Sequence, residues 1–450
     1  LPFFPRLDKD SIPILMAALC LLFGLAARPS PEPSLTGILP RSAVGLVLVP
    51  LLFVAAAMTT FTNTDRLVYG VKVIPGLQPY DAASAMLSSL VTLLPLLLAR
   101  KYLHSAEHHR VLVVVFAVAG LLYSLPALYE VRMSPQLNRM VYGFFPHSWG
   151  QHIRGDGYRP LVFLHHGLWL GIFFACALIA LVGWYRMRAG HLGRGWLVFA
   201  ILWMAATLIL AKSLGALLIA LAITPVALFL PVRLQLLAVA LIAGIVLLYP
   251  ILRQADALPV QKITDTIRLY EPQRAASLQY RLNNEDILLD LSQERFLFGW
   301  GGWGRFRAYD EETGRDTSTA DGRWVIILGQ GGMARYLATF GLFALPVILI
   351  ALRRRRFEIS QATAALGLMM AANLVDMLLN GTETTLTWLM AGALLGHVEQ
   401  RAPVAAGAAT PTGPPASAHS GAPDPAPGRG RGPVYTRQPI RHRRKALTET

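Results

Sequence analysis

Eleven long apolar runs constrain this chain more than any other feature. A helix needs about 20 mostly apolar residues to cross a bilayer, and inside lipid each backbone amide must bond within its own segment. A membrane barrel would show short alternating segments instead. The sequence therefore predicts an all-α fold, a polytopic transmembrane helical bundle. Its spans are 12–27, 42–61, 81–99, 111–129, 160–184, 196–211, 213–231, 234–252, 334–352, 360–379 and 384–398.

Composition agrees with a chain whose main solvent is lipid. Hydrophobic residues make up 54% of the 450 residues, and charged residues only 15%, against about 25% in a soluble protein. The net charge of +15 lies in short clusters between apolar runs, which indicates bilayer topology and not nucleic-acid binding. Both cysteines, Cys20 and Cys176, fall inside apolar runs, so no disulfide or metal site is predicted.

Arginine and lysine in short loops predict the orientation, because such residues stay in the cytoplasm. Three clusters share that side: Arg100, Lys101 and Arg110; Arg186, Arg188 and Arg194; and 353–356. The transmembrane domain is 1–400. Residues 401–450 form a Pro/Ala/Gly-rich, basic tail that we expect to be disordered and cytoplasmic. The odd span count puts the first residue outside, and one further upstream helix would return the N-terminus to the cytoplasm.

Two loops are predicted on the periplasmic side, 130–159 and the large loop 253–333. We expect the large loop to contain short amphipathic helices. It is itself basic, and long loops are exempt from the charge rule. The alternative explanation is that the loop meets an anionic substrate at the membrane face. Its cations are Arg253, Lys262, Arg268, Arg274, Arg281, Arg295, Arg305, Arg307, Arg315 and Arg323.

The segment 277–291 has the period of an amphipathic helix, with Leu278, Leu282 and Leu289 on one face. Arg281 lies beside that face, and Glu285 follows one turn on. These two side chains either form an exposed ion pair, or Arg281 binds a phosphate. Arginine suits a phosphate because its planar fork stays charged and binds bidentately.

Residues 298–304 place four glycines and two tryptophans, Trp300 and Trp303, in seven positions. Glycine permits tight turns and close ligand approach. The tryptophans either anchor the loop at the membrane interface or stack on sugar rings. Arg305 follows directly. We take Trp300, Trp303 and Arg305 as candidate substrate-binding residues.

Asp321 is a carboxylate at the mouth of the next membrane helix. It either orients and deprotonates a substrate hydroxyl, or caps the helical segment that follows. Arg323, two residues on, is a further candidate substrate-binding residue.

Arg159 precedes Pro160, where the fifth span opens. It either caps the helix start by snorkelling or binds substrate at the interface. His165 and His166 are adjacent and point to different faces, so they make a poor metal pair. Lys212 interrupts two apolar runs; it either snorkels or binds substrate, because ionisable groups in the membrane are often functional.

Nucleotide-binding and metalloprotease motifs are not found in usable context. The sequence therefore predicts no cofactor and no catalytic metal. If the chain is an enzyme, its substrate must carry the energy.

The order of several segments resembles the bacterial O-antigen ligase and O-antigen or exopolysaccharide polymerase superfamily. The resemblance covers roughly 100–350. The segments are Tyr158-Arg-Pro, Lys212-Ser, Ser277-Leu-Gln-Tyr-Arg-Leu, Phe296-Leu-Phe-Gly-Trp-Gly and Asp321-Gly-Arg-Trp-Val-Ile-Ile-Leu-Gly-Gln.

This resemblance implies a metal-independent membrane glycosyltransferase in the bacterial inner membrane, with a periplasmic active face. The donor would be a glycan on undecaprenyl diphosphate, and the acceptor a glycan or lipid. Arg159 and Arg281 match the paired arginines that hold the donor diphosphate. Asp321 stands where such ligases usually have the histidine that activates the acceptor hydroxyl, which favours a polymerase or an exopolysaccharide branch.

Two other functions remain open from the sequence. A transporter or flippase of lipid-linked sugars would tend to show inverted repeats and broken helices, and no convincing repeat is found. A non-catalytic subunit of a polysaccharide assembly system would tolerate alanine at Arg159, Arg281 and Asp321. Neither the sugar nor the choice between ligase and polymerase follows from the residues.

Overall fold

Every predicted span contains a helix in the computed structural model, which describes residues 11–23, 37–155, 157–188, 193–354 and 359–400. The helices that match the spans are α1 (Ile12–Leu22), α2 (Ala43–Phe61), α3 (Pro79–Tyr102), α4 (Ala106–Met133), α6 (Gly167–Met187), α7 (Arg194–Leu210), α8 (Leu214–Phe229), α9 (Val232–Gln254), α12 (Arg323–Leu352), α13 (Gln361–Leu379) and α14 (Thr385–Glu399).

Seven of these helices are long and apolar enough to cross a membrane: α2, α3, α4, α6, α9, α12 and α13. Three more, α1, α7 and α8, are apolar but shorter than 18 residues. The chain is therefore a multi-pass helical membrane protein by the length and composition of its helices. The predicted tail 401–450 and the end of the first span, 24–27, lie outside the described residues.

Polar residues cap the N-termini of several of these helices. The side chains of Ser42, Ser105, Ser360 and Thr384 each accept a hydrogen bond from the backbone of the first turn that follows. Such caps satisfy amides that have no partner inside the helix.

Two helices, α6 and α13, form the centre of the bundle. In the most apolar stretch of 18 residues of each helix, 78% of the α6 residues and 83% of the α13 residues are buried. The corresponding share is 39–44% for α2, α3, α4 and α9. Small residues let neighbouring helices approach closely. At Gly392 of α14, for example, an added methyl group would lie 2.1 Å from the carbonyl oxygen of Leu96 in α3.

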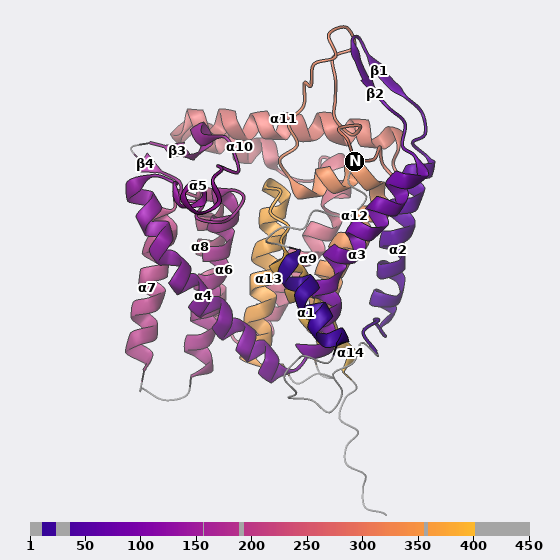
Figure 1. Cartoon of the computed structure of the whole chain (residues 1–450). Coiled ribbons are helices and arrows are strands. Elements are labelled where there is room, and N and C mark those ends of the chain that lie inside the picture. The colour runs from indigo at the N-terminus through magenta and orange to yellow at the C-terminus, as the bar shows by residue number, and fades with distance from the viewer. Residues whose placement is uncertain (1–10, 24–36, 156, 189–192, 355–358, 401–450) are drawn as a thin grey trace, which may run out of the picture. The chain divides into compact units, whose positions relative to one another are not determined.

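The helices alternate in direction, so the bundle has two distinct ends. One, here called the basic end, carries the connections α3–α4, α6–α7 and α12–α13, with Arg100 in the last turn of α3 and Arg188 and Arg353 directly after α6 and α12. The other, the loop end, carries the connections α2–α3, α4–α6 and α9–α12 (Figure 1). This agrees with the prediction that the three basic clusters share one face.

The large loop is dominated by one long helix. After α10 (Val260–Tyr270), the 23-residue α11 (Pro272–Glu294) crosses the loop end of the bundle (Figure 1). It contacts the end of α9 through Arg253 and the end of α13 through the Leu379 carbonyl. The helix predicted at 277–291 is confirmed, and α11 is longer than the short helices that were predicted for this loop, of which α10 is one.

Two helix starts next to the candidate site residues differ from the prediction. The helix expected from 160 begins at Gly167, because the Glu130 carboxylate accepts hydrogen bonds from the amides of Leu161 and Val162 and holds that stretch open. His166 is consequently the N-cap of α6 and not a residue inside the span. The helix expected from 334 already begins at Arg323 and has a break at Gly332.

Small antiparallel hairpins lie at the loop end. They are β1 (Leu67–Tyr69) with β2 (Lys72–Ile74), and β3 (Ile153–Arg154) with β4 (Gly157–Tyr158). The β1–β2 hairpin packs against the large loop, where the Lys72 ammonium lies 3.9 Å from the centre of the Tyr309 ring. The sequence did not indicate this role for the α2–α3 connection. A short helix α5 (Leu137–Tyr142) and a 3-10 turn at Trp149–His152 complete the α4–α6 connection.

Candidate functional site

Arg281 and Asp321 form an ion pair at the loop end. The Arg281 Nε lies 3.3 Å from Oδ2 of Asp321, and the two side chains are 36% and 37% exposed. Arg281 Nη1 also donates to the Leu379 carbonyl at 3.3 Å, which ties the pair to the end of α13. Two of the three predicted catalytic side chains are therefore in contact and open to solvent.

Both alternatives that the sequence left open for this pair are excluded. Asp321 does not cap α12, because Gly322 occupies the N-cap position. Glu285 does not pair with Arg281. It is buried, and its nearest cation is Arg253 of α9, at 4.0 Å.

Arg159 is held in place by the elements around it. It follows β4, is only 8% exposed, and donates from Nε and Nη2 to the Lys212 carbonyl at 3.4 and 3.2 Å. Gly167 makes room for it, since a methyl group added there would lie 2.5 Å from Cγ and Cδ of Arg159. None of the described carboxylates lies within ion-pair distance of this guanidinium.

Electrostatics link Arg159 to Arg281. Burial, and to a smaller degree the positive charges of Arg154 and Arg281, lower the pKa of Arg159 to about 10. Arg159 still carries its charge at neutral pH, so the site holds a buried cation with a second cation near enough to repel it. Such a concentration of positive charge favours an anionic ligand.

Lys212 supports this arrangement through its backbone. It joins α7 and α8 with φ at +51°, which orients its carbonyl toward Arg159. Its ammonium group donates to the Arg154 carbonyl at 2.8 Å. Lys212 therefore lies at the site, where its carbonyl bonds to Arg159 and its ammonium group bonds to Arg154.

Arg323 lies beside the Arg281–Asp321 pair and borders a cavity. Its Nε pairs with Oε2 of Glu383, whose other oxygen accepts from the Trp388 indole at 2.6 Å. The cavity has a volume of about 380 Å³. Gly381 lines it and also adjoins Asp321, because a methyl group added at Gly381 would lie 3.7 Å from the Asp321 carbonyl oxygen.

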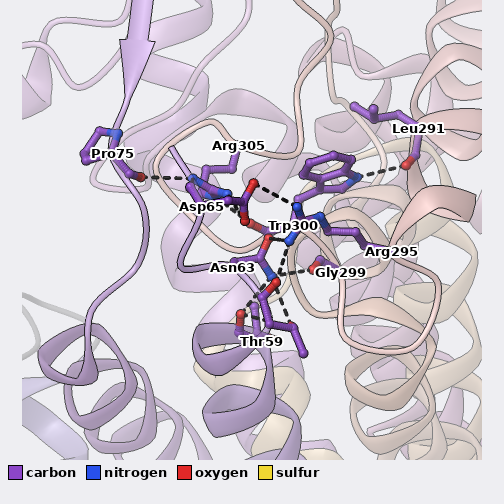
Figure 2. A network of polar contacts seen from close by, with 10 residues as sticks. Thr59, Asn63, Asp65, Pro75, Leu291, Arg295, Gly299, Trp300 and Arg305 are labelled. Atoms are coloured by element: carbon purple, nitrogen blue, oxygen red, sulfur yellow. Dashed lines mark hydrogen bonds and ion pairs between the residues drawn. The ribbon is translucent and has the colours of Figure 1, made fainter. Parts of the chain in front are cut away.

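Arg305 belongs to a different network (Figure 2). Its side chain is fully buried and donates to the carbonyls of Trp300, Asp65 and Pro75, while Nη2 lies 3.4 Å from the Asp65 carboxylate. Burial lowers the pKa of Arg305, and the nearby Asp65 charge opposes that shift. These contacts tie the large loop to the α2–α3 connection.

The two tryptophans of the glycine-rich loop are placed differently. Trp300 is 6% exposed, lies under the Arg295 guanidinium, and donates to the Leu291 carbonyl at 2.9 Å (Figure 2). Leu291 follows Arg281 by ten residues on α11, about 15 Å along the helix axis. Trp303 is 59% exposed. The structure does not bring Trp300 or Arg305 to the Arg281–Asp321 pair, and substrate contact by Trp300, Trp303 and Arg305 stays a prediction.

Three imidazoles gather next to Arg159. The rings of His147 and His152 lie 4.7 and 5.0 Å from that of His166, centre to centre, and Nδ1 of His152 lies 3.1 Å from the Arg159 carbonyl. Burial lowers the pKa of His166 to about 3, with help from its imidazole neighbours. The three rings pack against one another, and His152 contacts the backbone of Arg159. Among the described residues, no three His, Cys, Asp or Glu are grouped to hold a metal ion.

Sequence reasoning missed Glu130 and Trp388. Glu130 is a fully buried carboxylate that accepts from three backbone amides, and so shapes the connection that carries Arg159. An acidic residue one position beyond a predicted span was a usable signal, since such groups are costly near lipid. Trp388 had no comparable signal, because tryptophan is common at membrane interfaces.

Comparison with known proteins found no family model that matches the chain and no matching curated sequence. The fold and the site define the class as a multi-pass membrane helical bundle with a cationic site at one end.

Proposed function

We propose that this chain is a metal-independent membrane glycosyltransferase of the O-antigen ligase or polymerase type. It transfers or polymerises glycan from an undecaprenyl-diphosphate-linked donor at the periplasmic face of the bacterial inner membrane. The observation that supports this most is the pairing of Arg281 with Asp321 beside the buried cation Arg159.

Charge accounts for donor binding. A diphosphate placed between Arg159 and Arg281 is neutralised by two guanidinium groups, each able to donate two parallel hydrogen bonds. The fold already buries Arg159, so water screens the attraction between its charge and a bound anion only weakly.

The reaction uses Asp321 as the base. As the diphosphate engages Arg281, the Asp321 carboxylate is released to accept the proton of the acceptor hydroxyl. The hydroxyl oxygen bonds to the anomeric carbon, and the bond from that carbon to the diphosphate oxygen breaks. Undecaprenyl diphosphate leaves with the electron pair, stabilised by Arg159 and Arg281.

Purified protein in lipid nanodiscs tests the chemistry with a lipid-diphosphate-linked glycan. We expect Arg159→Ala, Arg281→Ala or Asp321→Asn to lower the transfer rate about 10²- to 10³-fold, the scale of losing one transition-state contact. Arg281→Lys is expected to recover little, because lysine cannot bind bidentately. Arg268→Ala is the control, since this exposed arginine of α10 pairs only with Asp265 in the described part of the chain. Full activity in the three site variants would refute the proposal.

A deletion strain separates the possible products. Loss of polymer with retention of single repeats indicates a polymerase, and free polymer with unmodified lipid A core indicates a ligase. Lipid-linked precursor trapped at the cytoplasmic face would favour a flippase instead, and an unchanged glycan profile would contradict all three.

A further inference from the structure

The 380 Å³ cavity next to Asp321 extends into the membrane part of the bundle. At the loop end it is bounded by Arg323 and Glu383. Deeper, it is lined by Ser88 and Thr92 of α3, and Ser88 lies nine residues into that helix, about 14 Å along its axis. The cavity therefore runs from the site toward the bilayer interior.

The lining of this cavity is neutral overall and mixed in character. Its charges, Arg323 and Glu383, pair with each other. Serine and threonine hydroxyls alternate with apolar groups along α3, and the indoles of Trp169 and Trp388 form part of the wall. An anion gains little here, whereas a sugar ring offers hydroxyl edges for hydrogen bonds and apolar C–H faces for the indoles.

The cavity has a thin cover on one side. α1 and its N-cap line it with Ile14 and Ser11, and α1 packs mainly against α3. None of the residues of α1 is buried, and Met16 is 52% exposed. Among the described residues, α1 is therefore the lightly packed helix that a lipid-anchored molecule would pass to reach this side of the cavity.

The cavity and the Arg281–Asp321 pair share a wall. The Leu379 carbonyl accepts from Arg281, the Asn380 carbonyl accepts from the Arg323 amide at 3.2 Å, and Gly381 lines the cavity against Asp321. A ring bound in the cavity therefore lies across this shared wall from the residue proposed to take its proton.

We infer that this cavity is the acceptor subsite: it binds the neutral sugar ring of a lipid-anchored acceptor, which approaches from the bilayer between α1 and α3. This acceptor role rests on the proposed glycosyl transfer. It divides the site into a cationic half for the donor and a neutral half for the acceptor.

Photo-crosslinking in nanodiscs tests binding directly. The probe is octyl β-glucoside with a diazirine in its alkyl chain, and the charged comparison probe is octyl phosphate with the same diazirine. We expect the glucoside, and not the phosphate, to label peptides of α1 or α3. Ser88→Trp should lower this labelling at least tenfold by filling the cavity. Leu90→Trp is the matched control, because Leu90 is 42% exposed on the same helix and does not line the cavity.

The outcomes distinguish this inference from the proposed function. In an active enzyme, Ser88→Trp should raise the KM for acceptor at least tenfold and leave the KM for donor unchanged. Equal glucoside labelling in Ser88→Trp and wild type, or an unchanged acceptor KM, overturns the inference while transfer activity stands. Labelling that follows the expected pattern in a chain without transfer activity overturns the acceptor role and leaves a sugar-binding cavity. Thr92→Leu replaces Ser88→Trp if that variant fails to fold.

Discussion

Individual charged residues near the site differ mainly in what neutralises them. Arg281 has a carboxylate, Arg305 has carbonyls and Asp65, and Arg159 has backbone acceptors and no carboxylate in the described part of the chain. Glu285 is a buried carboxylate, as Arg159 is a buried cation. It is 6% exposed, and burial raises its pKa to about 7, opposed by the Trp324 indole and the Arg253 charge.

This shift predicts how stability depends on pH. The folded chain keeps a proton on Glu285 between its ordinary pKa of 4.5 and about 7, where the unfolded chain has lost it. The stabilisation is therefore present at the acidic end of this window and is lost as pH rises toward 7. We expect the apparent melting temperature of Glu285→Gln in nanodiscs to fall less over this window than that of the wild type.

Glu294→Gln is the control, because Glu294 is an exposed glutamate at the end of the same helix. It should keep the wild-type dependence on pH. A Glu285→Gln curve parallel to the wild-type curve would contradict the assignment.

At the scale of elements, the break in α12 holds the glycine-rich loop in place. At Gly332 φ is +65° and ψ is −170°, a conformation essentially restricted to glycine. The glycine-rich loop docks against the break: the amides of Trp300 and Gly301 donate to the carbonyls of Gly329 and Gln330 at 2.8 and 2.9 Å. Backbone groups near the break are thus satisfied inside the protein, as a membrane helix requires.

Replacing this glycine should release the loop. In Gly332→Ala the added methyl would lie 2.3 Å from the Leu297 carbonyl carbon. We expect a loss of about 3 kcal/mol, from backbone strain combined with overpacking, measured as a lower melting temperature. Gly244→Ala in α9 has open space around its new methyl and should change stability by less than about 1 kcal/mol. Equal stability of the two variants would refute this role for Gly332.

For the whole molecule, alternating helix directions place all the site residues at the loop end. Arg159 and Asp321 lie in the connections that precede α6 and α12, and Arg281 lies in α11, which crosses that end. The basic clusters lie at the opposite end. If the charge rule holds, the site faces the periplasm.

Cysteine labelling measures this orientation. In a background with Cys20→Ala and Cys176→Ala, a membrane-impermeant maleimide should label Glu311→Cys in spheroplasts. It should label Arg188→Cys only after the inner membrane is broken. Both positions are exposed, at the loop end and the basic end respectively. The reverse pattern would place the site in the cytoplasm and exclude a periplasmic donor.

The sequence by itself determined the membrane helices and the set of charged candidates. Both follow from local rules, because a 20-residue apolar segment satisfies its own backbone in lipid and a charge near lipid is costly. Helix starts were less predictable where a distant group competes for the amides. Glu130 does so at 161–162 and delays α6 by seven residues relative to the predicted start at 160.

Only the tertiary structure decided which charges meet. Arg281 has Glu285 one turn away in sequence, yet it pairs with Asp321, forty residues on, because α11 turns Glu285 into the bundle toward Arg253. Arg281 and Arg305 look alike in sequence, and one is open to solvent while the other is sealed by three carbonyls. Ion pairing depends on which helix ends pack together, and residue spacing along one segment does not contain that information.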